Sequence, residues 1–134
     1  MMSATNKRVR RAILYILWEH GALTKEDVAV KVGNTQGIEH VPSPHSLSAL
    51  LSKTKSIIVV GKKQVLNYAG QSALHNLYDI DREIIHNEDE IICLLEPSVM
   101  SPKEKKNARK CFSCGRTRIF LEGHDECINC VRIV

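Results

Sequence analysis

Residues 111–130 read CFSCGRTRIFLEGHDECINC, in which Cys111 and Cys114 form one C-x-x-C pair and Cys127 and Cys130 form a second. Each C-x-x-C turn directs two thiolates to one point, and two such turns can complete a tetrahedron around zinc at a metal–sulphur distance of about 2.3 Å. The spacing therefore predicts a metal site with one structural zinc ion. An iron–sulphur cluster, a mononuclear iron or, for a single pair, a redox dithiol are the alternatives.

The residues between the two pairs suggest how they meet. Gly115 permits the positive φ that a tight turn after the second cysteine needs, residues 118–121 predict a strand and residues 122–125 a turn. This pattern resembles the zinc-ribbon family over residues 109–134, and the resemblance implies that all four cysteines are ligands. His124 is an alternative ligand for one position. Four thiolates leave no open position for a catalytic water, so we expect no enzyme.

Basic side chains surround the cysteines, namely Arg109, Lys110, Arg116 and Arg118. They can contact nucleic acid or an acidic protein surface, or stabilise the thiolates electrostatically. We select Arg116 and Arg118 as candidate nucleic-acid contacts.

Periodicity and capping signals predict three helices before residue 55. Val9, Ile13 and Leu17 mark the apolar face of the first, which Gly21 ends. Thr24 is the expected N-cap of the second helix, which stops at Gly33. For the third helix, Ser43 is the expected N-cap, Pro44 takes the first position, and Leu47, Leu50 and Leu51 face the core. Two runs rich in strand-favouring residues, 57–60 and 65–68, then flank residues 61–64. They predict a β-hairpin whose turn lies at 61–64.

The order helix, helix, helix, hairpin resembles the winged helix-turn-helix family. The matching features are a first helix ending at His20-Gly21, the entry LTKEDVA at residues 23–29, and a Ser-rich third helix that runs into a hairpin. The resemblance implies that the third helix enters the major groove and that the hairpin contacts the DNA backbone. The candidate contacts are then Ser46, Ser48, Lys53 and Lys55 on the helix and Lys62 and Lys63 on the wing.

Charge divides the chain into three parts. Residues 1–68 carry ten Lys/Arg and four Asp/Glu, residues 69–102 one and seven, and residues 103–134 eight and four, for net charges of +6, −6 and +4. The basic ends favour contact with polyanions and the acidic middle does not. Residues 69–80 predict a helix that closes the first unit, residues 97–108 predict a linker, and Cys93 is expected to be a buried small hydrophobe.

We therefore predict an α+β protein with a winged helix at 1–80, an acidic connector and linker at 81–108, and a zinc ribbon at 109–134. The apolar run 12–18 is too short to span a membrane, and no signal peptide is visible, so we expect an intracellular protein. The expected function is double-stranded DNA binding as a transcription factor or regulator, with a transcription-machinery protein as a further partner. The alternative is an adaptor that docks on a polymerase or other nucleic-acid enzyme without its own DNA contact. An accessory subunit of an RNA-processing enzyme is a third, weaker hypothesis, and the acidic segment is a candidate surface for a homodimer.

Overall fold

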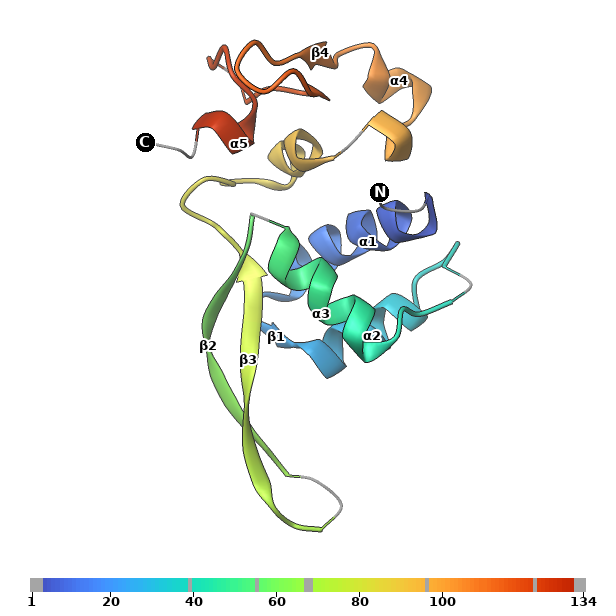
Figure 1. Ribbon diagram of the computed structural model, residues 1–134, viewed down its shortest axis with the longest axis vertical. Helices are drawn as coiled ribbons and strands as arrows, with labels where there is room; N and C mark the ends of the chain where they lie inside the picture. Colours follow the sequence, from blue (N-terminus) through green and yellow to red (C-terminus); the bar gives the residue numbers. More distant parts are fainter. Residues whose placement is uncertain are drawn as a thin grey trace.

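The computed structural model of the chain describes residues 4–38, 40–54, 56–66, 69–95, 97–121 and 123–131. Its elements are, in order, α1 (Ala4–His20), β1 (Leu23–Thr24), α2 (Lys25–Gly33), α3 (Pro44–Lys53), β2 (Ile57–Leu66), β3 (Ser72–Ile80), the 3₁₀ helices η1 (Glu88–Leu94) and η2 (Pro97–Val99), α4 (Pro102–Lys105), β4 (Arg109–Lys110), β5 (Thr117–Arg118) and α5 (Ile128–Val131). The chain is thus α+β, with helices packed on a small antiparallel sheet and a C-terminal cysteine cluster (Figure 1).

The capping signals predicted from the sequence are confirmed. The Thr24 hydroxyl accepts a hydrogen bond from the amide of Asp27, and the Ser43 hydroxyl accepts one from the amide of Ser46. Each bond satisfies an amide that lacks a partner within its own helix, which fixes where the helix begins. Pro44 occupies the first turn of α3, where a missing amide hydrogen has no cost.

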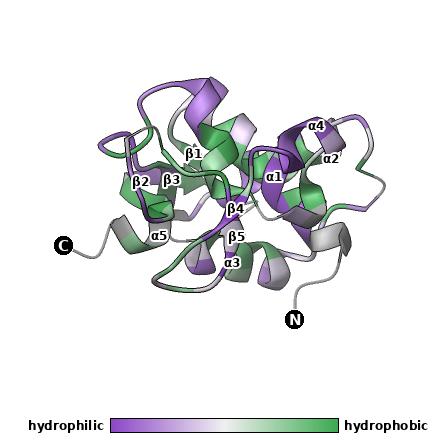
Figure 2. Ribbon diagram, turned by 90° about the horizontal axis from the view of Figure 1, so that it is seen from above, coloured by the Kyte–Doolittle hydropathy of each residue, from purple (hydrophilic) through white to green (hydrophobic). Residues whose placement is uncertain are grey.

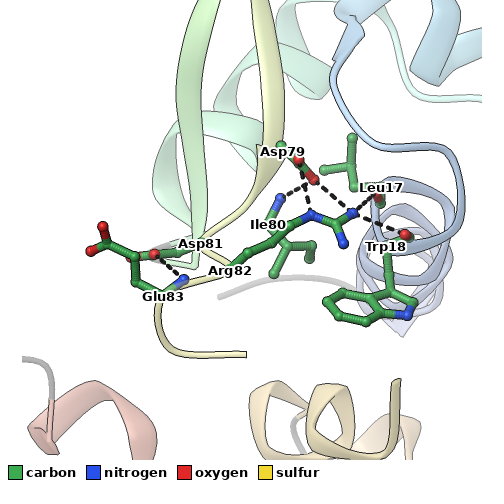
Figure 3. A network of polar contacts seen from close by, with 7 residues as sticks. All are labelled: Leu17, Trp18, Asp79, Ile80, Asp81, Arg82 and Glu83. Atoms are coloured by element: carbon green, nitrogen blue, oxygen red, sulfur yellow. Dashed lines mark hydrogen bonds and ion pairs between the residues drawn. The ribbon is translucent and has the colours of Figure 1, made fainter. Parts of the chain in front are cut away.

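The C-terminal end of α1 is closed by a glycine and by an arginine from a distant segment. Gly21 has a φ of 81°, and its amide donates to the carbonyl of Leu17 at 2.9 Å. Arg82 Nη2 donates to the carbonyls of Leu17 and Trp18 at 3.1 and 2.9 Å (Figure 3). The same guanidinium lies 4.4 Å from the centre of the Trp18 ring and pairs with Asp79 at 3.1 Å. A cation at these carbonyls also complements the negative end of the helix dipole.

The main sheet has the strand order β1-β3-β2 and is antiparallel throughout. Strand β2 pairs with β3 from Ile57 opposite Ile80 to Leu66 opposite Ser72, with a register shift between Val59 and Gly61. The predicted turn at residues 61–64 is therefore wrong, because the glycine marks an irregularity inside one long strand. The predicted helix over residues 69–80 is also wrong, since pairing with β2 overrides its local helical pattern.

Beyond the short strand β1, the two long strands continue as a two-stranded ribbon that projects from the helices (Figure 1). We call residues 61–66 and 72–76 the arm. A side-chain contact of 3.2 Å between His75 Nδ1 and Glu26 Oε2 ties the base of the arm to α2. The arm exposes large apolar side chains as well as lysines, because Leu66 is 71% and Leu74 is 66% exposed.

The acidic middle of the chain returns to α1 and joins its core. Ile85, Ile91 and Leu95 are at most 2% exposed and belong to the same apolar cluster as Ile13 and Leu14 of α1. Hydrophobic and hydrophilic residues both occur along α1, seen from above in Figure 2. Helix α1 packs against α2 and β3 and also against η1 and η2. The middle segment, which contains η1 and η2, therefore contributes to the core.

The segment predicted as a linker is also folded and attached to α1. It contains η2 and α4, and α4 begins with a capping box in which Ser101 and Glu104 exchange hydrogen bonds. The Glu104 carboxylate also accepts two hydrogen bonds from Arg11, at 3.0 and 3.2 Å. The linker prediction for 97–108 is therefore corrected, because a bidentate ion pair and apolar contacts hold this segment on α1. The division into domains at 80 and 108 stays a prediction.

The hydrogen bonds from Arg11 lower the pKa of Glu104. A carboxyl with a lowered pKa in the folded state stabilises that state above its unfolded pKa, and the contribution is lost as the pH falls through the folded value. Glu104→Gln should therefore lower the free energy of unfolding at pH 7 by about 0.5–1 kcal/mol, since the pair is partly solvated. In urea titrations the difference from wild type should be smaller at a pH below the unfolded pKa of glutamate than at pH 7, because protonation removes the charge that the pair needs. Glu83→Gln serves as the exposed control. An equal deficit of Glu104→Gln at both pH values would contradict the assignment.

Candidate metal centre and basic surfaces

The first cysteine pair lies on a tight turn at the end of a short hairpin. Strands β4 and β5 pair Lys110 with Thr117, and the amide of Cys111 donates to the carbonyl of Arg116 at 2.8 Å. The amide of Gly115 donates back to the carbonyl of Cys111 at 2.8 Å, and Gly115 has a φ of 75°. A residue with a Cβ rarely adopts this φ, so the glycine permits the turn that directs both sulphurs inward.

The second pair is held by the start of α5. Cys127 precedes this helix, and the amide of Cys130 donates to the carbonyl of Cys127 at 2.9 Å. The amide of Cys127 also donates to Cys111 Sγ at 3.4 Å, which connects the two turns directly. Amide hydrogen bonds to sulphur stabilise the thiolate form that a metal binds.

The four sulphur atoms lie within 4.8 Å of one another. The Sγ–Sγ distances are 3.5 Å between Cys114 and Cys127, and 3.7 Å from Cys130 to both Cys111 and Cys127. A tetrahedron with metal–sulphur bonds of about 2.3 Å has edges of about 3.8 Å. The arrangement is therefore compatible with one four-coordinate metal ion, of the size that suits zinc or iron.

The electrostatics of the cluster require a cation if all four cysteines are to be thiolates. The Cys127 amide lowers the pKa of Cys111 to about 6, whereas burial raises the pKa of Cys130 to about 12. Burial also raises the pKa of Cys127. One thiolate forms readily, but further negative charges at less than 4 Å repel it, so a divalent ion is the natural counter-charge.

Two other candidates for ligands lie outside the cluster. Cys93 is 4% exposed within η1, packs in the apolar core, and has a pKa raised to about 11 by burial. The prediction that it is a buried small hydrophobe is confirmed. His124 is exposed, and its carbonyl accepts a hydrogen bond from Arg109.

Arg118, which we expected to contact nucleic acid, lies in the interior. It is 2% exposed, and its Nη1 donates to the carbonyl of Leu94 in η1 at 3.0 Å. The expectation is corrected, because a buried guanidinium cannot reach a phosphate on the surface. Arg118 instead joins the cysteine module to η1, and Leu121 and Ile128 enter the same apolar cluster beside it.

The other predicted contact residues fall on three separate elements. Lys62 and Lys63 are exposed on the arm, within β2 instead of at a hairpin turn, and Arg116 is exposed on the first cysteine turn. Lys53 is exposed at the end of α3, and Lys55 lies outside the described residues. The Ser46 and Ser48 hydroxyls are half-buried on α3 and have local partners, in Ser43 for the first and in Lys25 for the second. Their role in binding stays a prediction.

Sequence reasoning missed one cation beside this surface. Lys25 Nζ donates to Ser48 Oγ at 3.2 Å, which brings the first residue of α2 to the side of α3. Lys25 and Ser48 line a hollow of about 260 Å³ together with Glu26, His75, Asn76 and Tyr78. Little in the sequence indicates this contact, because the side chain of a lysine directly after an N-cap normally lies in solvent.

Comparisons with known proteins give little beyond this geometry. No protein-family model matches the chain, and no curated protein matches it. One similar solved structure is that of a candidate nucleic acid binding protein from an uncultured marine organism, with a TM-score of 0.49 and 16% identity over 64% of this chain and 92% of that chain. A likeness at this level decides neither fold nor function. Within the described residues, no helix combines the length and apolarity needed to cross a membrane.

Purified protein should contain about one metal ion per chain, and Cys111→Ser should reduce this to near zero, since three thiolates do not close the site. The matched control is Cys93→Ser, which should keep its metal because Cys93 lies outside the cluster. Elemental analysis measures both. Because Arg118 bonds to η1 and Ile128 belongs to the common core, the Cys111 variant should also unfold at a lower urea concentration. Without urea, α1–α3 should keep their helical circular dichroism. Metal loss in Cys93→Ser would show that the ligand set is wrong.

Proposed function

We propose that this chain is an intracellular DNA-binding regulator of transcription, built from a winged helix and a structural zinc ribbon. The observation that carries the proposal is a long segment without carboxylates. Between His40 and Tyr78 the sequence has no Asp or Glu, and this segment supplies α3 and both strands of the arm. Phosphate repels carboxylates, so a segment without them suits a nucleic-acid backbone. A carboxylate that borders this segment in space is Glu26 of α2, which contacts His75.

The order of the elements supports the winged-helix part of the proposal. Strand β1 lies between α1 and α2 in the sequence and pairs with β3, and the β2–β3 hairpin follows α3 directly. In such an arrangement α3 is the helix that would enter the major groove. The arm would then bring Lys62 and Lys63 against the adjacent backbone, where ammonium groups neutralise phosphates without reading bases.

The cysteine cluster supports a structural role for zinc. Sulphur–sulphur distances of 3.5 and 3.7 Å fit a closed tetrahedron around one ion. The four thiolates would hold zinc and leave no position for a water or substrate, so we propose no catalytic activity for this site. The ion would instead fix the two turns against η1, because the module buries few apolar side chains of its own.

One observation favours the adaptor as a second candidate. Val60, Leu66 and Leu74 are 49%, 71% and 66% exposed on or beside the arm. Exposed apolar side chains of this size suit a protein partner, such as a component of a transcription complex or a second copy of the chain. The two candidates differ in whether the arm binds duplex DNA.

If Lys62 and Lys63 each contact a phosphate, the double variant to alanine should flatten the slope of log K against log salt by up to about 2, because each contact releases about 0.9 of a counterion. Affinity should fall alike for unrelated duplexes, since phosphate contacts carry no base information. The measurement is fluorescence anisotropy with labelled duplexes across ionic strength.

The control for the lysine pair is Glu88→Gln on the exposed start of η1, which should not weaken binding. Ser46→Ala and Ser48→Ala should change the preference among sequences if either hydroxyl reaches a base edge. No duplex binding at low salt, or an unchanged slope in the double lysine variant, would favour the adaptor.

A further inference from the structure

The first cysteine turn presents a bare aromatic ring. Phe112 is 100% exposed, although it directly follows Cys111, which is fully buried. The turn is closed on both sides by the hydrogen bonds of Cys111 with Arg116 and with Gly115, each 2.8 Å. Because both sulphurs of the turn point toward the cluster, the two residues between them, Phe112 and Ser113, are exposed. The ring is thus held at the surface by a rigid turn.

Other aromatic rings of the described chain are covered. An arginine lies over each of three rings: Arg11 over Tyr15, Arg82 over Trp18 and Arg109 over Phe120, with distances to the ring centres of 5.7, 4.4 and 4.2 Å. Tyr78 packs against the core. The ring of Phe112 therefore differs from the other described aromatic rings, because neither of its faces is covered by a side chain. Both faces are available to a ligand.

The chain segment that carries the ring is rich in basic residues, although the second cysteine turn of the module exposes Asp125 and Glu126. Residues 103–118 contain seven Lys/Arg and one Glu, and six of the seven basic residues, all except Arg118, are exposed. The single carboxylate, Glu104, is neutralised by Arg11. Lys110 Cε comes within 3.8 Å of the place where a Cβ on Gly115 would lie, so this lysine lies over the turn that carries Phe112. Strand β4 is correspondingly drawn as hydrophilic in Figure 2.

We propose that Phe112, with Lys110 and Arg116, forms a binding site for single-stranded nucleic acid. An unpaired base stacks on the ring, and the neighbouring phosphates lie against the two cations. A base within a duplex has both faces covered by its neighbours, so it cannot stack on a protein ring. A hydrophobic protein pocket would take the ring as well, but it gives no reason for the two exposed cations, Lys110 and Arg116, that flank the same turn.

This site is separate from the duplex surface proposed for α3 and the arm, because it lies on the cysteine module. The chain would then contact a duplex and an unpaired strand at the same time, as at a junction or an opened region of DNA. The two modes can fail independently: the arm lysines test the first, and Phe112 tests the second.

The test is a titration of the whole 134-residue chain, with its metal content measured, against labelled oligo-dT and oligo-rU of about 12 nucleotides, a length within the usual range of single-strand sites. Phe112→Ala should weaken binding by about 5- to 100-fold, the loss expected for one stacked base. Phe112→Trp should restore it, and its added fluorescence should be quenched by the oligonucleotide relative to wild type, which reports Trp18 alone. The duplex affinity of Phe112→Ala should stay unchanged, and so should its metal content.

The matched control is Val30→Ala, which removes a side chain that is 64% exposed on α2 and should not affect binding. Stronger binding of oligo-rU or of oligo-dT identifies the strand that the site prefers, and either supports the proposal. Unchanged oligonucleotide affinity in Phe112→Ala overturns it and leaves the ring for a protein partner. An equal loss of duplex affinity, or no quenching in Phe112→Trp, also overturns it.

Discussion

The burial of α1 on two sides is the constraint on which the rest of the structure depends. Helix α1 packs against α2 and β3 and also against η1 and η2, and its Leu14 lines a small pocket with Leu94, Leu95 and Val99. A helix that is apolar around much of its circumference must be covered by two layers. The second layer is the returning segment 81–100. Arg82 bonds to α1 at one end of this segment, and Arg11 of α1 donates to the carbonyl of Val99 at the other. Loss of either layer would expose several large apolar side chains.

The cysteine module depends on that second layer in turn. Its strands are two residues long, so it has little core of its own. Leu121 and Ile128 pack into the common cluster, and the buried Arg118 donates a hydrogen bond to the carbonyl of Leu94. The metal site and the helical unit are thereby coupled through η1. Figure 1 shows β4, which leads into the first cysteine turn, at the end of the molecule opposite the arm.

Local chemistry made much of the candidate site predictable. The two C-x-x-C pairs could be paired in one cluster from spacing alone, because a turn of that length directs both thiolates to one side. Helix ends at Thr24, Ser43 and Gly21 were predictable for the same reason, since capping acts over three or four residues. Lys62 and Lys63 are exposed but lie within a strand, which was not foreseen, and their contact with phosphate stays a prediction.

The sequence by itself determined the cysteine cluster, the caps and the three N-terminal helices, all of which depend on residues close together along the chain. Only the tertiary structure decided that residues 69–80 form a strand, that the acidic segment enters the core, and that Arg118 is buried while Phe112 is bare. The hairpin turn escaped prediction because Gly61 looks locally like a turn residue, whereas it lies opposite Leu77 beside an irregularity within one long strand. Strand pairing and packing on α1 join residues far apart in the chain, and their free energy outweighs local propensity.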